Sequence, residues 1–445
     1  MKLFISQGRF VSVTLIAILS ITWLATPVFA QSGGNLDLRT NVIGGGGTTS
    51  GGVSLQTTGT IGQPSTGPSN GGNILIQGGF WQAIRGVASS LPVVQFSASS
   101  YTVSEGSPRV DITVTRSGDA TSSATVVFQT IDSAGLTNCN VFNGIASPRC
   151  DFINTIGTMT FAAGETSKSF SIAIIDDSYA EGNETFTVSL SGTSSATLGT
   201  RATATVTIID NDAVTGPNPI DNTNFFVRQQ YIDFLNREPD PPGFAGWTST
   251  INNCSGDTTQ CDRIHVSQLF FQSAEFQERG YFVYRFYDVA LGRKPDYAEF
   301  VVDLAGVSGF LDNNQLEAAK VAFIAGFMAR AAFVSTYNSL TNQQYVDALL
   351  NTAGVTLSNR QAMIDGLNNS TLTRAAVLRQ IVESTEVSTR FNHEAYAVME
   401  YFGYLRRQPD AFYLDWIRVL DSTNDPRGMV TGFVTSQEYR QRFGP

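Results

Sequence analysis

The chain has 445 residues, of which 42% are hydrophobic, and its 38 acidic side chains against 28 lysines and arginines give a formal net charge of −10. This length provides for more than one folded domain. The acidic balance and the absence of a basic run disfavour nucleic-acid binding, which requires a cationic face.

Residues 1–30 have the pattern of a secretory signal peptide. Lys2 and Arg9 precede the apolar run VSVTLIAILSITWLA, and small residues precede a cleavage site before Gln31. An uncleaved anchor helix is the alternative, although the run is short for a bilayer span. Cleavage removes two cations and changes the net charge to −12. We expect a secreted protein, or one at the extracellular surface, with no transmembrane segment after signal removal.

Residues 31–90 are rich in glycine, with 16 of the 41 glycines and only three charged side chains. Such a composition is typical of a flexible linker. Short alternating apolar stretches such as GGNILIQGGFWQAI favour a short N-terminal β segment that packs Phe80 and Trp81. Both interpretations stay open.

Residues 91–213 alternate apolar and polar side chains, which predicts strands with one buried face each. The clearest runs surround Ile172, Val188 and Val206. Seven or so strands are available, as an antiparallel sandwich needs; the others are VVQFSA, RVDITVTR, SATVVFQT and IGTMTF.

Acidic residues gather where three of these strands begin or end: Asp176, Asp177, Glu181, Glu184, Asp210 and Asp212. If the three strands are neighbours, at least two of these clusters lie at one end of the sandwich, where they repel unless a cation sits among them. Only Lys168 and Arg201 are near in sequence. Calcium, which takes roughly six to eight oxygen ligands in flexible geometry, meets that need. The alternative is that these acids are ordinary turn formers.

Three stretches of this region resemble the Calx-beta domain, the immunoglobulin-like, calcium-binding sandwich of sodium/calcium exchangers and many bacterial surface proteins: EGSPRVDITVTRSG, FAAGETSKSFSIAIIDDSYAEGNETFTVSLSG and TATVTIIDND. The resemblance implies a Ca²⁺ site made of Glu105, Asp151, Asp176, Asp177, Glu181, Asp210 and Asp212. Two features depart from the family pattern. Asn211 replaces a frequent aspartate, and the loop before Asp151 carries the insertion TNCNVFNGIASPRC.

The four cysteines fall as two close pairs, Cys139 with Cys150 and Cys254 with Cys261. Export permits disulfides, and three pairings are formally possible. We expect local pairing, because each pair brackets a polar loop that a disulfide would tighten. Zinc is the alternative, although neither pair has the spacing or the histidines of a zinc site.

A linker at 214–222 precedes a change of period from two to about 3.6, which predicts an all-α domain over residues 223–445. Val227, Tyr231 and Phe234 lie on one face of its first helix, which is expected to stop at Pro239. The segments LNREPD, LGRKPD and LRRQPD repeat, with a degenerate copy near Leu350.

A second signature recurs in phase with the first, in SAEFQERG, ARAAFVSTY, ESTEVSTRF and TSQEYRQRF. Its apolar anchors are spaced by 57, 54 and 52 residues, so four stacked helical units are predicted. These anchors are Phe276, Phe333, Val387 and Tyr439. The two signatures resemble a helical family of unknown function in bacterial exported and S-layer-like proteins.

The repeated arginines, Arg237, Arg293 and Arg407, are candidate functional residues. Their position at a helix end favours a structural role, with each guanidinium satisfying the terminal carbonyls. Trp247 and Trp416 occupy comparable places after the Pro-Asp pairs, which favours repeat-core packing over a sugar-stacking platform.

No catalytic motif is present: His265 and His393 belong to no metal or triad pattern, and GxSxG, GxGxxG and P-loop motifs are absent. His393, beside Glu394, is expected at a solvated helix start. We therefore expect a protein that is not an enzyme, an exported calcium-binding adhesion or scaffold protein whose helical domain engages an unknown protein or glycan partner. The alternative is a secreted hydrolase of glycans or peptides with an unrecognised carboxylate pair.

Overall fold

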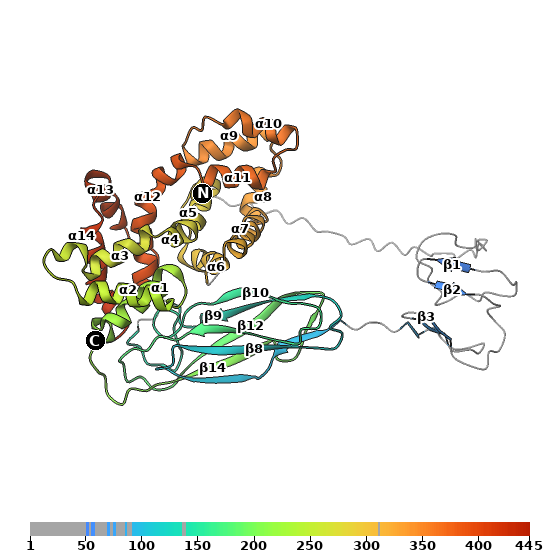
Figure 1. The fold of residues 1–445 in the computed structure, drawn as a ribbon, viewed down its shortest axis with the longest axis horizontal. Coiled ribbons are helices and arrows are strands. Elements are labelled where there is room, and N and C mark those ends of the chain that lie inside the picture. The colour runs from blue at the N-terminus through green and yellow to red at the C-terminus, as the bar shows by residue number, and fades with distance from the viewer. Residues whose placement is uncertain are drawn as a thin grey trace, which may run out of the picture. The chain divides into compact units, whose positions relative to one another are not determined.

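The computed structural model describes residues 91–445 apart from 136–138 and 310–311, and five short strands between residues 50 and 86 (Figure 1). The chain divides into two compact units, Met1–Ser89 and Ser90–Pro445. The expected signal peptide and the packing of Phe80 and Trp81 lie outside the described residues. In the glycine-rich segment β1 pairs with β2, and β4 pairs with β3 and β5, all antiparallel. These strands are β1 Ser50–Gly52, β2 Leu55–Thr57, β3 Ser69–Gly71, β4 Ile74–Ile76 and β5 Arg85–Gly86.

The second unit begins with a two-sheet sandwich. One sheet has the strand order β10-β9-β12-β14-β7 and the other the order β11-β8-β6-β13. The strands are β6 Val93–Phe96, β7 Ser100–Ser104, β8 Arg109–Ser117, β9 Ala124–Ile131, β10 Ile156–Phe161, β11 Ser167–Ala173, β12 Glu184–Ser194, β13 Thr197–Leu198 and β14 Thr203–Ile209.

The predicted alternation accounts for the sandwich core, since Ile172, Val188 and Val206 are all fully buried. Two strands that we did not expect, β7 and β13, are short and pair in parallel, with β14 and β6 respectively. β12 and β14 are antiparallel neighbours, but β11 lies in the other sheet. The three acid-bearing strands are therefore not all neighbours, because the sandwich places one of them across the core.

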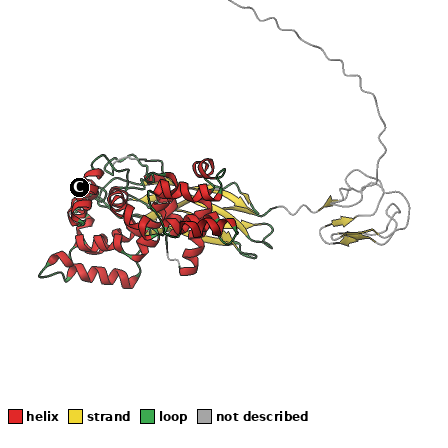
Figure 2. Ribbon diagram, turned by 90° about the horizontal axis from the view of Figure 1, so that it is seen from above, coloured by secondary structure: helices red, strands yellow, loops and turns green. Residues whose placement is uncertain are grey.

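Helices occupy the rest of the unit, separate in sequence from the strands (Figure 2), so the predicted order of a β-sandwich followed by an all-α region is confirmed. The helices are η1 Pro219–Asp221, α1 Thr223–Leu235, α2 Pro241–Asn252, η2 Thr258–Gln260, α3 Arg263–Gln272, α4 Ala274–Glu278, α5 Gly280–Leu291, α6 Tyr297–Val307, α7 Asn313–Met328, α8 Ala331–Tyr337, α9 Asn342–Ala353, α10 Arg360–Asn368, α11 Arg374–Val382, α12 Thr385–Glu400, η3 Tyr401–Leu405, α13 Tyr413–Thr423, α14 Arg427–Val434 and α15 Gln437–Arg440.

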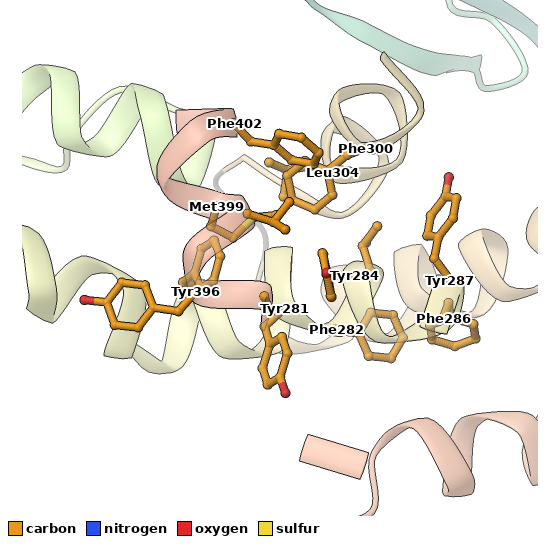
Figure 3. Close-up of a cluster of buried hydrophobic side chains, with 14 of the residues drawn as sticks. Tyr281, Phe282, Tyr284, Phe286, Tyr287, Phe300, Leu304, Tyr396, Met399 and Phe402 are labelled. Carbon is orange, nitrogen blue, oxygen red and sulfur yellow. The ribbon is translucent and has the colours of Figure 1, made fainter. Parts of the chain in front are cut away.

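The core of the helical region surrounds α5. Every residue from Gly280 to Ala290 is buried, including the charged Arg285 and Asp288. Its aromatic side chains belong to one hydrophobic cluster with Phe300 of α6, Met399 of α12 and Phe402 of η3 (Figure 3). Their rings contact those of Phe323 and Phe327 of α7. The hydrophobic cluster continues through all the repeat units, so none of them closes a core alone.

The repeat shows first in how helices end. α1, α5, α9 and η3 each stop before a residue with a left-handed backbone, a conformation that ends a helix; these residues are Asn236, Gly292, Gly354 and Arg406. α1 therefore ends at Leu235, and the expected stop at Pro239 is wrong because the left-handed residue acts first. The degenerate copy near Leu350 keeps this left-handed turn, at Gly354, although it lacks the Arg-x-Pro-Asp residues.

The repeated arginines join the two sequence signatures. Arg237 donates to both oxygens of Glu275, each at 2.7 Å. Arg407 does the same to Glu438, at 2.6 and 2.8 Å. In both units the arginine comes from the Arg-x-Pro-Asp segment and the glutamate from the segment that carries the anchor.

Arg293 departs from this pattern because Ala332 stands where its anchor segment would supply the glutamate. It pairs instead with Glu299 of α6, with both N–O distances at 2.8 Å. The side chains of these arginines are thus structural, as expected, but they bind carboxylates and the carbonyl of the following residue rather than the last carbonyls of the preceding helix.

The four predicted anchors are all buried: Phe276, Phe333, Val387 and Tyr439. In three of the four units a serine hydroxyl caps the helix and accepts the N–H of the anchor itself. The signature is therefore a capped helix start whose first turn points into the core.

Trp247 and Trp416 pack against the hydrophobic core, as expected. His393 lies well inside α12, which begins after its cap at Ser384, so its expected position at a helix start is wrong. Its ring nitrogens are held by Asp421 and Asn424, at 2.8 and 3.1 Å.

Cys139 is bonded to Cys150, and Cys254 to Cys261. Local disulfide pairing is the arrangement that we expected. The zinc alternative is wrong for both pairs, because a sulfur in a disulfide is not a thiolate ligand.

Across the described residues, no single helix has both the length and the apolarity needed to cross a membrane. Only α7 and α8 taken together reach both, and that pair is bent by 70° at its break.

Candidate metal centre

Acidic side chains from four loops meet at one end of the sandwich. Glu105 follows β7, Asp151 lies between β9 and β10, and the other acids lie between β11 and β12, at the start of β12 or after β14. β7 and β14 run parallel and β12 runs antiparallel to them, so two strand ends and one strand start share this edge. The strand order thus gathers acids that are separated in sequence.

The carboxylates form three overlapping sets, within each of which the ligand oxygens lie within 4.8 Å of one another. Glu105 belongs to two of the sets and Glu181 to two, so the sets form one continuous group. The sets are Glu105 with Asp210 and Asp212, Glu105 with Asp177 and Glu181, and Asp151 with Glu181 and Glu184.

Backbone amides position these acids. Asp210 accepts the N–H of Glu181 and of Gly182 on one oxygen, at 2.9 and 2.6 Å, and the N–H of Asp212 on the other, at 2.7 Å. It therefore ties the loop before β12 to the loop after β14. Asp151 accepts the N–H of Ser147 in the same way.

Glu105 and Asp177 each keep one oxygen for a ligand. Glu105 Oε1 accepts the N–H of Asp177 at 3.0 Å, and Asp177 Oδ1 accepts the N–H of Tyr179 at 2.7 Å. The second oxygens, Glu105 Oε2 and Asp177 Oδ2, are buried and have no hydrogen-bond partner among the described residues. The two residues are only 3% and 5% exposed. A buried oxygen without a partner costs about 1–3 kcal/mol, which a bound cation would offset.

No cationic side chain serves that purpose. None of the ion pairs among the described residues includes a member of the three sets. Lys168, expected to be near, pairs with Glu165 at 3.1 Å, and Arg201 donates to the carbonyl of Phe96 at 2.7 Å.

Burial consequently raises the pKa values of six of these acids, and repulsion from neighbouring carboxylates adds to the rise in all of the six but Asp151: Glu105, Asp151, Asp177, Glu181, Glu184 and Asp212. Burial is the main cause for Glu105, whose pKa rises to about 7, and for Asp177, whose pKa rises to about 9 with Glu105 as the next contributor. Glu181 rises to about 10, again through burial first and then through Asp151. Asp151 and Glu184 share a hydrogen bond, and burial raises the pKa of both. Without a cation the group thus binds protons at neutral pH.

The structure brings six of the seven predicted ligands into the three sets. The exception, Asp176, accepts a hydrogen bond from the Asn211 amide at 3.1 Å and raises the pKa of Glu105 from outside the sets. Asn211, the departure from the family pattern, thus occupies the side chain of Asp176.

Glu184 belongs to the third set but was not among the predicted ligands. It is the first residue of β12 and is 4% exposed. The alternating pattern could have indicated this position. Glu184 lies two residues before Phe186 and four before Val188, so its side chain is on the same face of β12, the face toward the core.

The donor set is made only of carboxylate oxygens, from loops and from the first residue of β12. Such a set suits a hard cation such as Ca²⁺ rather than zinc, which prefers nitrogen and sulfur ligands in tetrahedral geometry. The unpartnered oxygens of Glu105 and Asp177 show that the residues present fit such an ion.

Comparisons with known proteins find similarity in the residues of the sandwich. The Calx-beta domain family matches residues 89–212. Sodium/calcium exchanger 1 of Canis lupus familiaris is 33% identical over 147 residues, covering 28% of this chain and 14% of the exchanger. The sodium/calcium exchanger Calx of Drosophila melanogaster is 32% identical over 118 residues, covering 26% of this chain and 11% of that protein. The chain thus spans only a small part of the curated relatives that it matches.

Among solved structures, the apo-form Calx CBD1 domain is 31% identical to this chain, and the TM-score is 0.25. The match covers 28% of this chain and 100% of that one. The calcium binding domain CBD12 of CALX1.1 is 32% identical, with a TM-score of 0.24 over 27% of this chain and 46% of that one. The family match and the two-sheet fold of the same residues lead to one assignment: residues 89–212 form a Calx-beta domain.

Proposed function

We propose that the acidic group at the end of the sandwich binds calcium, in an exported protein that acts in adhesion or as a scaffold. The observation that carries the calcium proposal is the pair of buried oxygens on Glu105 and Asp177, which have no hydrogen-bond partner in the part of the chain that the structure describes. They lie within a group of carboxylates that forms no ion pair with a described cationic side chain. Calx-beta domains are typically calcium-binding. The ligands are Glu105, Asp151, Asp177, Glu181, Glu184, Asp210 and Asp212, with Asp176 in a supporting position.

Titration calorimetry of the full chain with calcium tests this proposal, and melting in calcium and in chelator gives a second measurement. A ligand that binds only the folded state stabilises it by about 2.7 kcal/mol at a hundredfold excess over Kd. We expect a higher melting temperature in calcium and little effect of magnesium, which requires near-octahedral geometry. Equal melting in calcium and chelator, with no heat of binding, would refute the site.

We further propose that residues 223–445 belong to the helical family of bacterial exported proteins that their signatures resemble. We also propose that this region binds a protein or glycan partner rather than catalysing a reaction. The repeated polar side chains support a non-catalytic role, because Arg237 and Arg407 are engaged by glutamates of the neighbouring signature. Turnover of a glycan or peptide substrate by the purified chain would favour a hydrolase instead.

Export itself rests on residues 1–30 and stays a proposal. Expression of the whole chain in a bacterium that secretes proteins, followed by N-terminal sequencing, tests it. A mature N-terminus at Gln31 in the exported fraction is the expected result, and an uncleaved chain retained in the membrane fraction would support the anchor alternative.

A further inference from the structure

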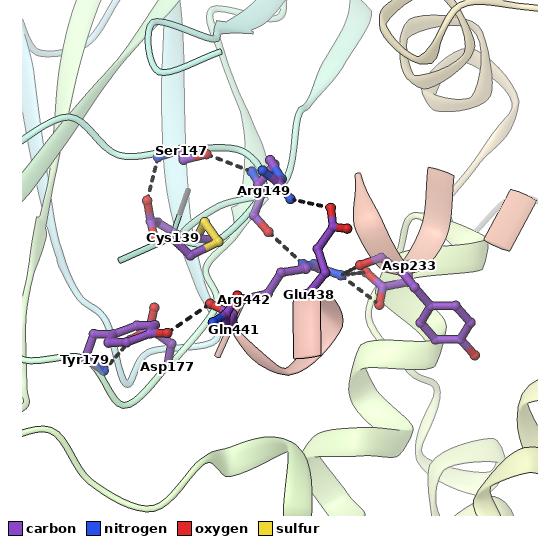
Figure 4. The surroundings of a disulfide bond; sticks show 12 residues. Cys139, Ser147, Arg149, Asp177, Tyr179, Asp233, Glu438, Gln441 and Arg442 are labelled. Atoms are coloured by element: carbon purple, nitrogen blue, oxygen red, sulfur yellow. Dashed lines mark hydrogen bonds and ion pairs between the residues drawn. A yellow bond between two sulfur atoms is a disulfide. The ribbon is translucent and has the colours of Figure 1, made fainter. Parts of the chain in front are cut away.

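The loops that carry the acidic group also hold the helical region. Ser178, next to Asp177, donates from its N–H and its Oγ to the carbonyl of Phe443, at 3.0 and 3.1 Å. Tyr179 donates from its hydroxyl to the carbonyl of Gln441 at 3.2 Å (Figure 4). The residues that follow a metal-ligand candidate therefore bind the C-terminal segment, residues 436–445.

The disulfide loop makes a second attachment to the same segment (Figure 4). Arg149 forms an ion pair with Glu438 at 3.2 Å, and its carbonyl accepts a hydrogen bond from Arg442 Nε at 2.9 Å. Cys150 and then Asp151 follow directly in the chain. One short loop thus supplies a carboxylate to the acidic group and two bonds to the C-terminal segment.

Apolar and backbone contacts strengthen the junction. Ile175, which immediately precedes Asp176, packs in the hydrophobic cluster of the helical region, as does Ile153. Arg228 of α1 donates to the carbonyls of Pro108 and Ile174, at 3.0 and 2.9 Å.

On the helical side the C-terminal segment is bonded to the core. Arg442 is fully buried and donates to both oxygens of Asp233, at 3.2 and 3.3 Å, and to the carbonyl of Tyr404 at 2.9 Å. Glu438, held by Arg149, is also held by Arg407. The segment cannot shift without breaking these charge-assisted bonds, so it carries the position of the sandwich loops into the helical core.

We propose that calcium binding at the sandwich end locks the C-terminal segment, and with it the helical region, onto the sandwich. This inference rests on the proposed calcium site. A cation bound by these acids would join the loops that carry them, and the same loops position Ser178, Tyr179 and Arg149. Without the cation that link is missing. A ligand that binds better to the docked arrangement shifts the population toward it, and the coupling is reciprocal.

Hydrogen exchange of the full chain measures the coupling directly. We expect amide exchange in residues 436–445 to be about tenfold slower in calcium than in chelator, within the range typical of coupled sites. Equal exchange in the two conditions, in protein that calorimetry shows to bind calcium, would overturn the coupling and leave the calcium site intact. If calorimetry shows no binding, the proposed function and the coupling both fail.

Reciprocity provides a second test. The double variant Ser178→Ala/Tyr179→Phe keeps every carboxylate, yet its calcium affinity should fall by the same factor, about tenfold. Tyr179→Phe alone is the milder variant, and it should show a smaller loss in the same direction. Unchanged affinity in the double variant would overturn the proposal.

The variant Arg149→Ala distinguishes loss of the junction from a direct effect of charge, because the two change calcium affinity in opposite directions. Removal of a cation near an anionic group would raise calcium affinity through charge alone, whereas loss of the junction lowers it. Arg109→Ala is the matched control, since this arginine is 57% exposed on β8 and pairs with Asp111. Higher affinity in Arg149→Ala than in the control would refute the coupling.

Discussion

Glu105 and Asp177 show how single residues prepare the acidic group for a cation. In each, a backbone amide holds one oxygen and the other oxygen is buried without a partner. The amide fixes the direction of the carboxylate before an ion arrives, which reduces the ordering that binding requires. Glu184 completes the group from the buried face of β12.

Replacement of Glu184 by Gln tests its assignment as a ligand. The amide keeps the size of the side chain but removes one negative charge, and calcium affinity depends on the charge count of the ligands, so we expect a loss of roughly tenfold. Calorimetry measures it. Glu165→Gln, in the exposed turn before β11, is the control and should bind as the wild type does; equal affinity in both variants would remove Glu184 from the site.

The raised pKa values predict how stability depends on pH in calcium-free protein. The pKa of Glu105 is about 7 and that of Asp177 about 9, whereas both groups ionise near pH 4 in the unfolded chain. The folded state therefore binds more protons, and stability falls as pH rises from about 6 to 9. Calcium should abolish this trend.

Denaturant unfolding at three pH values, in metal-depleted buffer and in calcium, measures the effect. The variant Asp177→Asn, which removes one of the proton-binding groups, should show a shallower decline in metal-depleted buffer. A stability that rises with pH between 6 and 9 without metal would contradict the electrostatic account of the acidic group.

At the scale of elements, two short signatures build the helical repeat. One ends a helix in a left-handed residue and supplies an arginine; the other begins a helix with a capping serine, a glutamate and a buried anchor. The bidentate pairs of Arg237 with Glu275 and of Arg407 with Glu438 hold the end of one element against the start of another. In these two units the bonds join one signature to the other.

Arg237→Ala should destabilise the helical region by about 1.5–3 kcal/mol, which is the range for hydrogen bonds to charged groups. The reason is that Glu275 loses a bidentate partner at a site where the arginine is only 10% exposed. Arg418→Ala is the matched control: this arginine is 72% exposed and pairs with Asp415 three residues away, so its removal should cost at most about 1 kcal/mol. Urea unfolding compares the two. Equal losses would show that the signature pair has no special role.

At the scale of the whole molecule, the disulfide between Cys139 and Cys150 lies at the junction of metal site and helical region. It closes the loop that carries Arg149, and Asp151 follows directly. The other disulfide, Cys254–Cys261, closes a loop before α3, in the helical region. The two crosslinks therefore provide a matched pair for experiment.

Cys139→Ser/Cys150→Ser should lower calcium affinity, because the freed loop must be ordered again when Asp151 binds the ion. Closing a loop of this length contributes about 3 kcal/mol or less in the chain-entropy description. Cys254→Ser/Cys261→Ser should leave calcium affinity unchanged while it lowers the stability of the helical region. Calcium binding that is insensitive to the first pair would separate the disulfide loop from the site.

Much of this architecture could be predicted from the sequence. Alternation around Ile172, Val188 and Val206 marked buried strand faces, because side-chain direction in a strand depends only on local backbone geometry. Anchors such as Phe276 were predictable from a signature that recurs at spacings of 57, 54 and 52 residues. The sequence was less informative about helix boundaries. At Pro239 an earlier signal acted first, because the left-handed Asn236 had already ended the helix. His393 lies within a helix rather than at its start.

The sequence by itself therefore determined seven of the sandwich strands, the helical nature of the region that follows, its repeat and the presence of acids at strand ends, because these features show as local patterns in the chain. Only the tertiary structure decided which carboxylates share a site. It placed β11 across the core from β12, brought Asp151 and Glu184 together, and left Asp176 outside the three sets. It also joined the acidic loops to residues 436–445, because strand pairing and domain packing bring together residues that are far apart in sequence, and no local pattern encodes their distances.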